Sequence, residues 1–120
     1  IDSMICGSPR NYASSLFLAT SVQISLGLPT LHILTKCDAA PKRTLRRVMA
    51  WHESEDAFEV DAGARLSGLQ VVLAREVIQS IQHIASSTPL IPVSAKTMDG
   101  FVELHSALSM VLGEGELELR

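Results

Sequence analysis

Short apolar runs separated by longer segments of helical periodicity dominate this sequence and limit the folds it can adopt. The runs at residues 3–6, 30–34 and 90–93 have strand length and indicate buried strands. Strands separated by helices pair in parallel through right-handed crossovers. The sequence therefore predicts an α/β fold of three layers, with three parallel strands and helices on both faces.

The first two predicted helices lie on either side of the second strand. Residues 11–26 carry apolar positions at helical spacing and stop before Gly27. Residues 42–58 follow Pro41, which suits a helix start, and we expect Ala62-Gly63 to break this helix. Its early basic and late acidic residues oppose the helix dipole, so tertiary contacts or a partner must hold it.

Two further helices are predicted in the second half of the chain. Residues 66–84 place apolar side chains three and four positions apart, in a stripe wide enough for burial on two sides. This stripe indicates core, with a subunit interface as the alternative. We expect Asp99 to cap the N-terminus of the last helix.

Composition narrows the class of protein. The chain has 120 residues and is 47% hydrophobic, which suits one domain with a core. Its net charge of −3 argues against a broad nucleic-acid surface, and no apolar run reaches the roughly 20 residues of a membrane span. The two cysteines show no disulfide or zinc pattern, which favours a cytoplasmic setting. The chain also begins inside a predicted strand, which indicates a fragment.

Two loops that each follow a predicted strand are the strongest candidates for a site. They are Thr35-Lys36-Cys37-Asp38 and Ser94-Ala95-Lys96. In open parallel sheets, ligands bind beyond the carboxyl ends of the strands, where both loops would lie. Each motif alone is weak, since Asp38 could simply close a strand-to-helix turn. Together, in this order and context, they indicate one ligand site.

The residue types in these loops suit a guanine base. An ionised carboxylate such as that of Asp38 only accepts hydrogen bonds, and guanine offers it two donors on one edge, whereas adenine offers no such pair. The backbone N–H of Ala95 can meet the O6 acceptor. Lys36 and Lys96 have apolar stems that can cover the two faces of a planar base. Thr35 and Ser94 would shape the loops.

These motifs resemble those of the P-loop GTPases, and within them the GPN-loop GTPases. Thr35 to Asp38 is similar to the N/T-K-x-D motif, with Thr for the commoner Asn, and Ser94 to Lys96 matches S-A-K. The stretches at residues 9–12, 26–30 and 93–101 support the narrower family. The 94 − 38 = 56 positions between Asp38 and Ser94 leave room for the extra helix that the family implies. The resemblance covers nearly the whole chain and identifies residues 1–120 as the C-terminal half of a GTP-binding domain.

The other half of such a domain is not in this sequence. There is no G-x-x-x-x-G-K-[ST] loop, no D-x-x-G switch and no Gly-Pro-Asn tripeptide. The resemblance implies a GTPase that binds GTP or GDP, with Mg²⁺ held and catalysis performed by residues outside this chain. The chain alone is expected to be inactive. The family consists of dimeric switches or assembly factors, and its eukaryotic members help assemble RNA polymerase, so a homodimer and protein partners are implied.

Two alternatives stay open at this point. The chain could be a non-catalytic interaction module that keeps half of a nucleotide-binding fold, or an ATP-binding relative that does not need Asp38. His52 and Glu53, with Asp56 one turn on, could form a metal patch, although a solvated acidic helix face is the stronger interpretation. Cys6 and Trp51 are interpreted as core residues.

Overall fold

The computed structural model describes residues 1–119, except for the side chains of residues 83–87 and 114–119. Within these residues the fold consists of five helices and two strands. In chain order the elements are α1 (Pro9–Leu26), β1 (His32–Leu34), α2 (Lys42–Glu53), α3 (Glu55–Arg65), α4 (Leu69–Ser87), β2 (Leu90–Pro92) and α5 (Phe101–Leu119).

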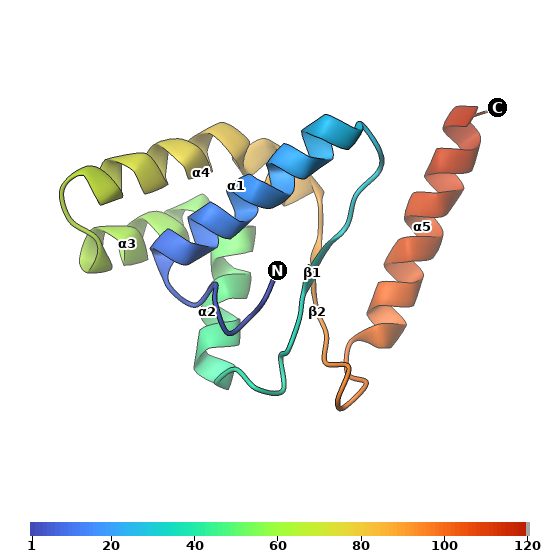
Figure 1. Ribbon diagram of the computed structural model, residues 1–120, viewed down its shortest axis with the longest axis horizontal. Helices are drawn as coiled ribbons and strands as arrows, with labels where there is room; N and C mark the ends of the chain where they lie inside the picture. Colours follow the sequence, from blue (N-terminus) through green and yellow to red (C-terminus); the bar gives the residue numbers. More distant parts are fainter. Residues whose placement is uncertain (120) are drawn as a thin grey trace.

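The two strands are adjacent and parallel, as the sequence predicts. His32 lies opposite Leu90, and Leu34 lies opposite Pro92. The strands run between α5 on one side and α1 to α4 on the other, so helices cover both faces (Figure 1). The mixed α/β class is therefore confirmed, but the prediction of three strands is wrong for residues 1–119, which contain two.

The segment at residues 3–6, predicted to be a strand, is a series of turns. Asp2 causes this, because its carboxylate oxygen Oδ1 accepts from the N–H of Met4 at 2.9 Å and its carbonyl accepts from the N–H of Ile5 and Cys6. Asp side chains that bond the backbone two residues on compete with strand pairing in this way. The N-terminal residues are linked to the end of β1 by one parallel bridge, between Asp2 and Thr35, and by the hydrogen bond from the Ile1 amino group to the carbonyl of Ile33 at 2.8 Å. The prediction of a buried strand at residues 3–6 is thus wrong.

The helix predicted over residues 42–58 is two helices. Ser54 separates them, with extended backbone (φ −140°, ψ 118°) and a hydroxyl that accepts from the N–H of Ala57 at 3.3 Å. Glu55 and Asp56 therefore lie in the first turn of α3, where carboxylates stabilise a helix. The predicted break at Ala62-Gly63 is wrong, because α3 continues through both residues to Arg65.

The remaining helix ends follow local capping. Ser8 caps α1, whose first residue is Pro9, and Gly27 ends it in the left-handed conformation at φ 62°. Helix α4 begins at Leu69, three residues later than predicted, because Leu66 still caps α3 and Gly68 turns the chain at φ 58°.

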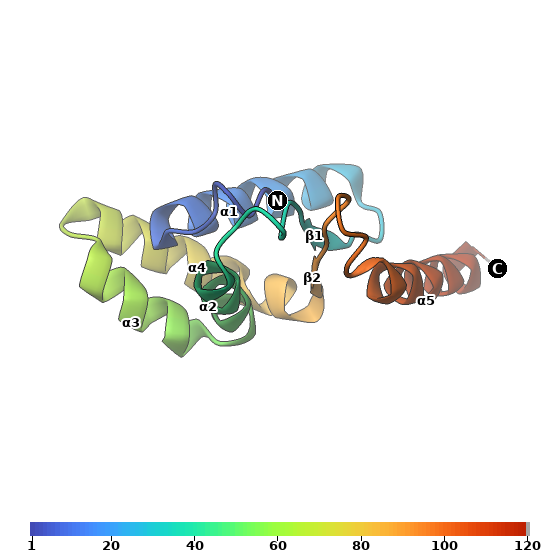
Figure 2. The same ribbon diagram turned by 90° about the horizontal axis from the view of Figure 1, so that it is seen from below.

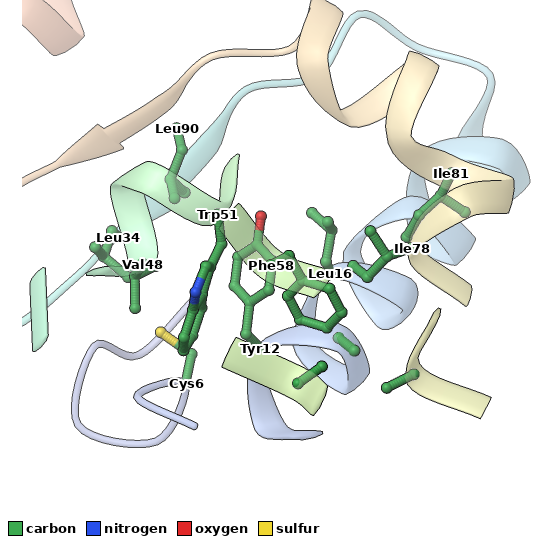
Figure 3. Close-up of a cluster of buried hydrophobic side chains, with 13 residues drawn as sticks. Cys6, Tyr12, Leu16, Leu34, Val48, Trp51, Phe58, Ile78, Ile81 and Leu90 are labelled. Carbon is green, nitrogen blue, oxygen red and sulfur yellow. The ribbon is translucent and has the colours of Figure 1, made fainter. Parts of the chain in front are cut away.

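The core lies on the side of the sheet that faces α1 to α4. Tyr12 of α1 contacts the rings of Trp51 and Phe58, at centroid distances of 5.4 and 5.8 Å, and all three are buried (Figure 3). The Nε1–H of Trp51 donates to the Asp61 carboxylate at 2.7 Å. Cys6 is fully buried beside this aromatic cluster, so the interpretation of Cys6 and Trp51 as core residues is confirmed.

Helix α4 is core on one side only. Ala74, Ile78 and Ile81 are buried against the rest of the domain, whereas Leu69 and Leu73 are exposed. Burial on two sides, which the wide apolar stripe predicts, does not occur within this chain, and a subunit interface stays the open alternative for the exposed side.

Helix α5 covers the opposite face of the sheet and stands apart from α1 to α4 in both views (Figures 1 and 2). None of its residues from 101 to 113 is buried. The predicted cap by Asp99 is wrong, because its carboxylate accepts from the Thr97 hydroxyl at 3.0 Å and Gly100 intervenes before the helix. Among the described residues, no helix is both long enough and apolar enough to cross a bilayer.

Candidate functional site

The loops that follow β1 and β2 lie side by side and are joined by hydrogen bonds. The backbone N–H of Cys37 donates to the carbonyl of Val93 at 3.1 Å, which continues the strand pairing into the loops. The hydroxyl of Ser94 donates to the Asp38 carboxylate oxygen Oδ1 at 2.6 Å. Two motifs that are 56 positions apart in sequence are thus in direct contact.

Both loops open onto one cavity of about 600 Å³ between the sheet and the start of α5. Its apolar wall includes Ile33, Val93, Phe101 and Leu104. The predicted site residues that line it are Thr35, Lys36, Asp38, Ala95 and Lys96. The volume lies within the range of small-molecule sites, roughly 300–1,000 Å³.

Ser94, the remaining predicted site residue, lies behind this wall and is 1% exposed. Its hydroxyl accepts from the N–H of Thr97 at 3.1 Å while it donates to Asp38. Its carbonyl accepts from the N–H of Met98, and its own N–H donates to the carbonyl of Asp99. Ser94 therefore holds the second loop in a closed turn and fixes the Asp38 carboxylate beside it.

The polar groups that face the cavity keep free hydrogen-bonding capacity. Asp38 is exposed, and only its Oδ1 atom is engaged within the described part of the chain. The N–H of Ala95 donates to no protein acceptor among the residues described. The Asp38 carboxylate and the Ala95 N–H therefore keep hydrogen-bonding capacity for a ligand in the cavity that both residues line.

Lys36 joins the first loop to the N-terminal segment. Its Nζ atom donates to the Asp2 carboxylate oxygen Oδ2 at 2.8 Å. This hydrogen bond, together with the one from the Met4 N–H, holds the pKa of Asp2 below its usual range. The hydrogen bond to Asp2 in turn raises the pKa of Lys36. Lys36 and Met98 are the non-glycine residues among those described with a left-handed backbone, at φ 60° and 65°, and each lies in one of the two loops.

Thr35 anchors the start of the chain rather than the second loop. Its N–H and its hydroxyl both donate to the carbonyl of Ile1, at 2.8 and 3.1 Å. Cys37, at the variable position of the motif, is half-buried and directs its thiol to the carbonyl of Leu34. Burial raises the pKa of the Cys37 thiol.

The residues considered for a metal patch are not brought together. His52 is buried, where its Nε2–H donates to the carbonyl of Thr88 at 2.8 Å and its Nδ1 accepts from the Tyr12 hydroxyl at 3.2 Å. Glu53 and Asp56 are exposed. The interpretation as a solvated face is thus wrong for His52. No group of three or more potential metal ligands occurs within the described residues.

Two residues of this site were not found from the sequence. Asp2 reaches Lys36 across 34 positions, and no local pattern marks that pair. The N–H of Thr97 donates to the Ser94 hydroxyl. The sequence contains a signal for this bond, because Ser side chains in turns commonly accept from a backbone N–H a few residues later.

Comparisons with known proteins agree with this architecture. The crystal structure of PAB0955, a GTPase from Pyrococcus abyssi in its apo form, superimposes with a TM-score of 0.77 at 22% sequence identity. The match covers 93% of this chain and 45% of that one, so this chain spans less than half of the length of PAB0955, and the two share a fold. No curated protein matches the chain in sequence. Residues 1–114 match the sequence profile of one family, and the chain therefore belongs to the family described as conserved hypothetical ATP-binding proteins.

Proposed function

We propose that this chain is the guanine-recognition portion of a GPN-loop-type GTPase, the C-terminal half of its GTP-binding domain, acting as a switch or assembly factor. The observation that supports the proposal is that Asp38 and Ala95 line one cavity, with the Ser94 hydroxyl bonded to the Asp38 carboxylate at 2.6 Å.

The choice of guanine over adenine rests on the Asp38 carboxylate. Guanine presents the N1–H and the exocyclic amine to this group, and each oxygen can accept one of these donors. Oδ1 can do so while it accepts from Ser94, because each carboxylate oxygen has two lone pairs. Adenine places an acceptor nitrogen where guanine has N1–H, so it would face the carboxylate with a repulsive pair. GTP and GDP are therefore the proposed ligands, although the family description names ATP.

The other residues around the cavity have complementary roles in this proposal. The N–H of Ala95 donates to O6 of the base. The apolar stems of Lys36 and Lys96 cover its two faces, and the charged end of Lys36 is paired with Asp2. Thr35 holds the first loop to the N-terminal segment, and Ser94 holds the second loop.

Phosphate binding and hydrolysis need groups that this chain does not supply. A GTPase uses backbone amides and a lysine around the phosphates, and Mg²⁺ to neutralise the developing charge. We assign the phosphate contacts and Mg²⁺ to residues outside this chain; the described residues contain no group of three or more potential metal ligands. The base contacts contribute roughly 4–7 kcal/mol, against about 4–15 kcal/mol for lost freedom of the ligand. We expect this chain alone to bind GTP with a Kd near or above about 1 mM and to hydrolyse none.

The direct test substitutes Asp38 in the full-length protein and measures whether its base specificity changes from guanine to xanthine. Asp38→Asn replaces an acceptor oxygen with a donor amine, which opposes the guanine amine but suits the extra carbonyl of xanthine. We expect GTP binding to weaken roughly 10- to 150-fold, since a hydrogen bond to a charged group contributes about 1.5–3 kcal/mol. Binding of xanthosine triphosphate should improve. Isothermal titration with both nucleotides measures the two changes.

Asp56→Asn is the matched control, because Asp56 is an exposed carboxylate of α3 that does not line the cavity. This variant should bind GTP like the wild type. Unchanged GTP affinity in Asp38→Asn would rule out Asp38 as the residue that reads the base.

We also propose that the protein forms a homodimer through the exposed apolar surface of α1 and α4. Phe17 and Leu73, 55% and 56% exposed, line a shallow groove between these helices. Such large apolar side chains gathered on one surface are typical of interaction sites. Light scattering of the wild type should give the mass of a dimer, and Leu73→Glu should give a monomer. A wild-type monomer at high concentration would refute this interface.

A further inference from the structure

Asp2 is connected to the candidate base site although it does not line the cavity. Its Oδ2 atom accepts from the Nζ of Lys36 at 2.8 Å, and the two side chains are 25% and 62% exposed. Lys36 does line the cavity, beside Asp38. Asp2 thus contacts the outer end of a side chain whose stem forms part of the cavity wall.

Asp2 is itself held in a fixed position. Its second oxygen, Oδ1, accepts from the N–H of Met4, and its carbonyl accepts from the N–H groups of Ile5 and Cys6. The bridge to Thr35 adds a backbone link to the end of β1. Because both carboxylate oxygens and the backbone are engaged, Asp2 offers Lys36 a stationary acceptor rather than a second flexible side chain.

Lys36 is fixed at both ends by this arrangement. Its backbone is left-handed at φ 60°, and its carbonyl accepts from the N–H of Ala39 in a tight turn. Its Nζ atom is tied to Asp2. A free lysine side chain loses considerable rotamer freedom when it covers a ligand, whereas a stem that is already ordered loses little.

We propose that Asp2 is a positioning residue that holds the stem of Lys36 in place to cover one face of the bound guanine base. This rests on the proposed function of the site. Asp2 touches no part of the nucleotide, and it does not read the base edge, which is the role of Asp38. The lowered pKa of Asp2 and the raised pKa of Lys36 mean that the pair stays ionised at neutral pH.

A double-mutant cycle on the full-length protein tests this role. Asp2→Asn keeps the size of the side chain and removes its charge, while Lys36→Met keeps an apolar stem that cannot pair with Asp2. We expect each to weaken GDP binding about two- to fivefold, the scale of a partly exposed ion pair. The double variant should bind no worse than Lys36→Met, because Asp2 acts through Lys36. Lys36→Arg, which keeps a cation opposite Asp2, should retain most of the affinity.

The matched control is Glu59→Gln, which breaks a comparable ion pair away from the site. Glu59 lies 3.6 Å from Arg75 and is 30% exposed, close to the exposure of Asp2. This variant should bind GDP like the wild type. Titration of the Asp38→Asn variant with xanthosine diphosphate gives a further readout. Adding Asp2→Asn to that variant should weaken its binding of xanthosine diphosphate by the same factor by which Asp2→Asn alone weakens GDP binding. The factor should be the same because a stem that packs on the face of the base does not contact the edge groups in which xanthine and guanine differ.

The outcomes separate this proposal from the one on which it rests. If Asp2→Asn leaves GDP binding unchanged, or still weakens it when Lys36 is Met, Asp2 does not position Lys36. Should Asp2→Asn not fold, equal affinities for Lys36→Met and the wild type overturn the proposal just as well. If Asp38→Asn exchanges specificity while Asp2→Asn has no effect, the positioning role alone fails. A wild-type protein that binds no guanine nucleotide refutes both.

Discussion

Replacing Gly100 by alanine should destabilise the protein more than any other glycine substitution that the structure allows us to compare. Gly100 connects the Ser94 loop to α5 with φ 84°, a conformation that L side chains rarely adopt. A Cβ atom at this position would lie 2.0 Å from the carbonyl oxygen of Pro92 and 3.1 Å from the Cα of Val93. Since such contacts are essentially never shorter than 3.0 Å, the loop must move by about 3.0 − 2.0 = 1 Å.

The expected loss in the free energy of unfolding is the sum of a backbone cost and a steric cost. Substitutions at two other glycines allow these costs to be measured separately. A non-glycine residue in the left-handed region costs roughly 1–2 kcal/mol, and forcing extra atoms into a packed site costs about 1–3 kcal/mol. Gly100→Ala should therefore lower the free energy of unfolding by about 2–5 kcal/mol. Gly27→Ala carries only the first term, because φ is 62° but no atom lies within 4 Å. Gly63→Ala, inside α3 with free space around it, should stabilise by about 0.5–1 kcal/mol.

Urea denaturation of the three variants measures these differences. Trp51 is the single tryptophan and is fully buried, so its fluorescence reports unfolding of the core, and far-UV circular dichroism reports the helices. The predicted order of stability is Gly63→Ala, wild type, Gly27→Ala, Gly100→Ala. A loss for Gly100→Ala no larger than that for Gly27→Ala would refute the steric argument, because only the backbone term would then remain.

Three further predictions concern the core. Tyr12→Phe leaves the buried Nδ1 of His52 without its donor and should cost about 1–3 kcal/mol in urea denaturation; a loss below about 0.5 kcal/mol would contradict the hydrogen bond. Burial, and then the neighbouring His52, lower the pKa of His32, so this side chain takes up a proton at a higher pH in the unfolded state than in the folded state. Stability should fall as the pH drops below about 6.5 towards the folded pKa, and His32→Leu should reduce that slope; an unchanged slope would exclude His32 as its source. Cys6 is fully buried, and burial raises the pKa of its thiol, so a thiol reagent should modify it only on unfolding; rapid labelling of the native protein would contradict this.

The sequence predicts the two strands and the loops after them because their signals are local. An apolar run followed directly by polar residues defines the carboxyl end of a strand, and parallel pairing then places both ends at one edge of the sheet. The contact between Asp38 and Ser94 follows from that placement alone. The roles of these residues in ligand binding stay predictions.

The features that the sequence does not predict depend on a competing local bond or on distant partners. Residues 3–6 have strand-like composition, but the Asp2 side chain offers their N–H groups an alternative acceptor. At Ser54 the two helical patterns join with no Gly or Pro between them, and a Ser followed by Glu55 and Asp56 is the only local mark of the break. The polarity of His52 suggests exposure, yet Tyr12 and Thr88 satisfy its ring from elements far apart in sequence.

The left-handed backbones of Lys36 and Met98 set a limit on how far this protein can be stabilised without a functional cost. Each costs roughly 1–2 kcal/mol that a glycine would not, and Met98 is 63% exposed, so packing does not offset that cost. Met98→Gly is accordingly a simple route to a more thermostable protein. The same exchange at Lys36 would remove the side chain that we assign to the base. Of these two strained positions, one is open to engineering, and the other is a point where stability and activity trade against each other.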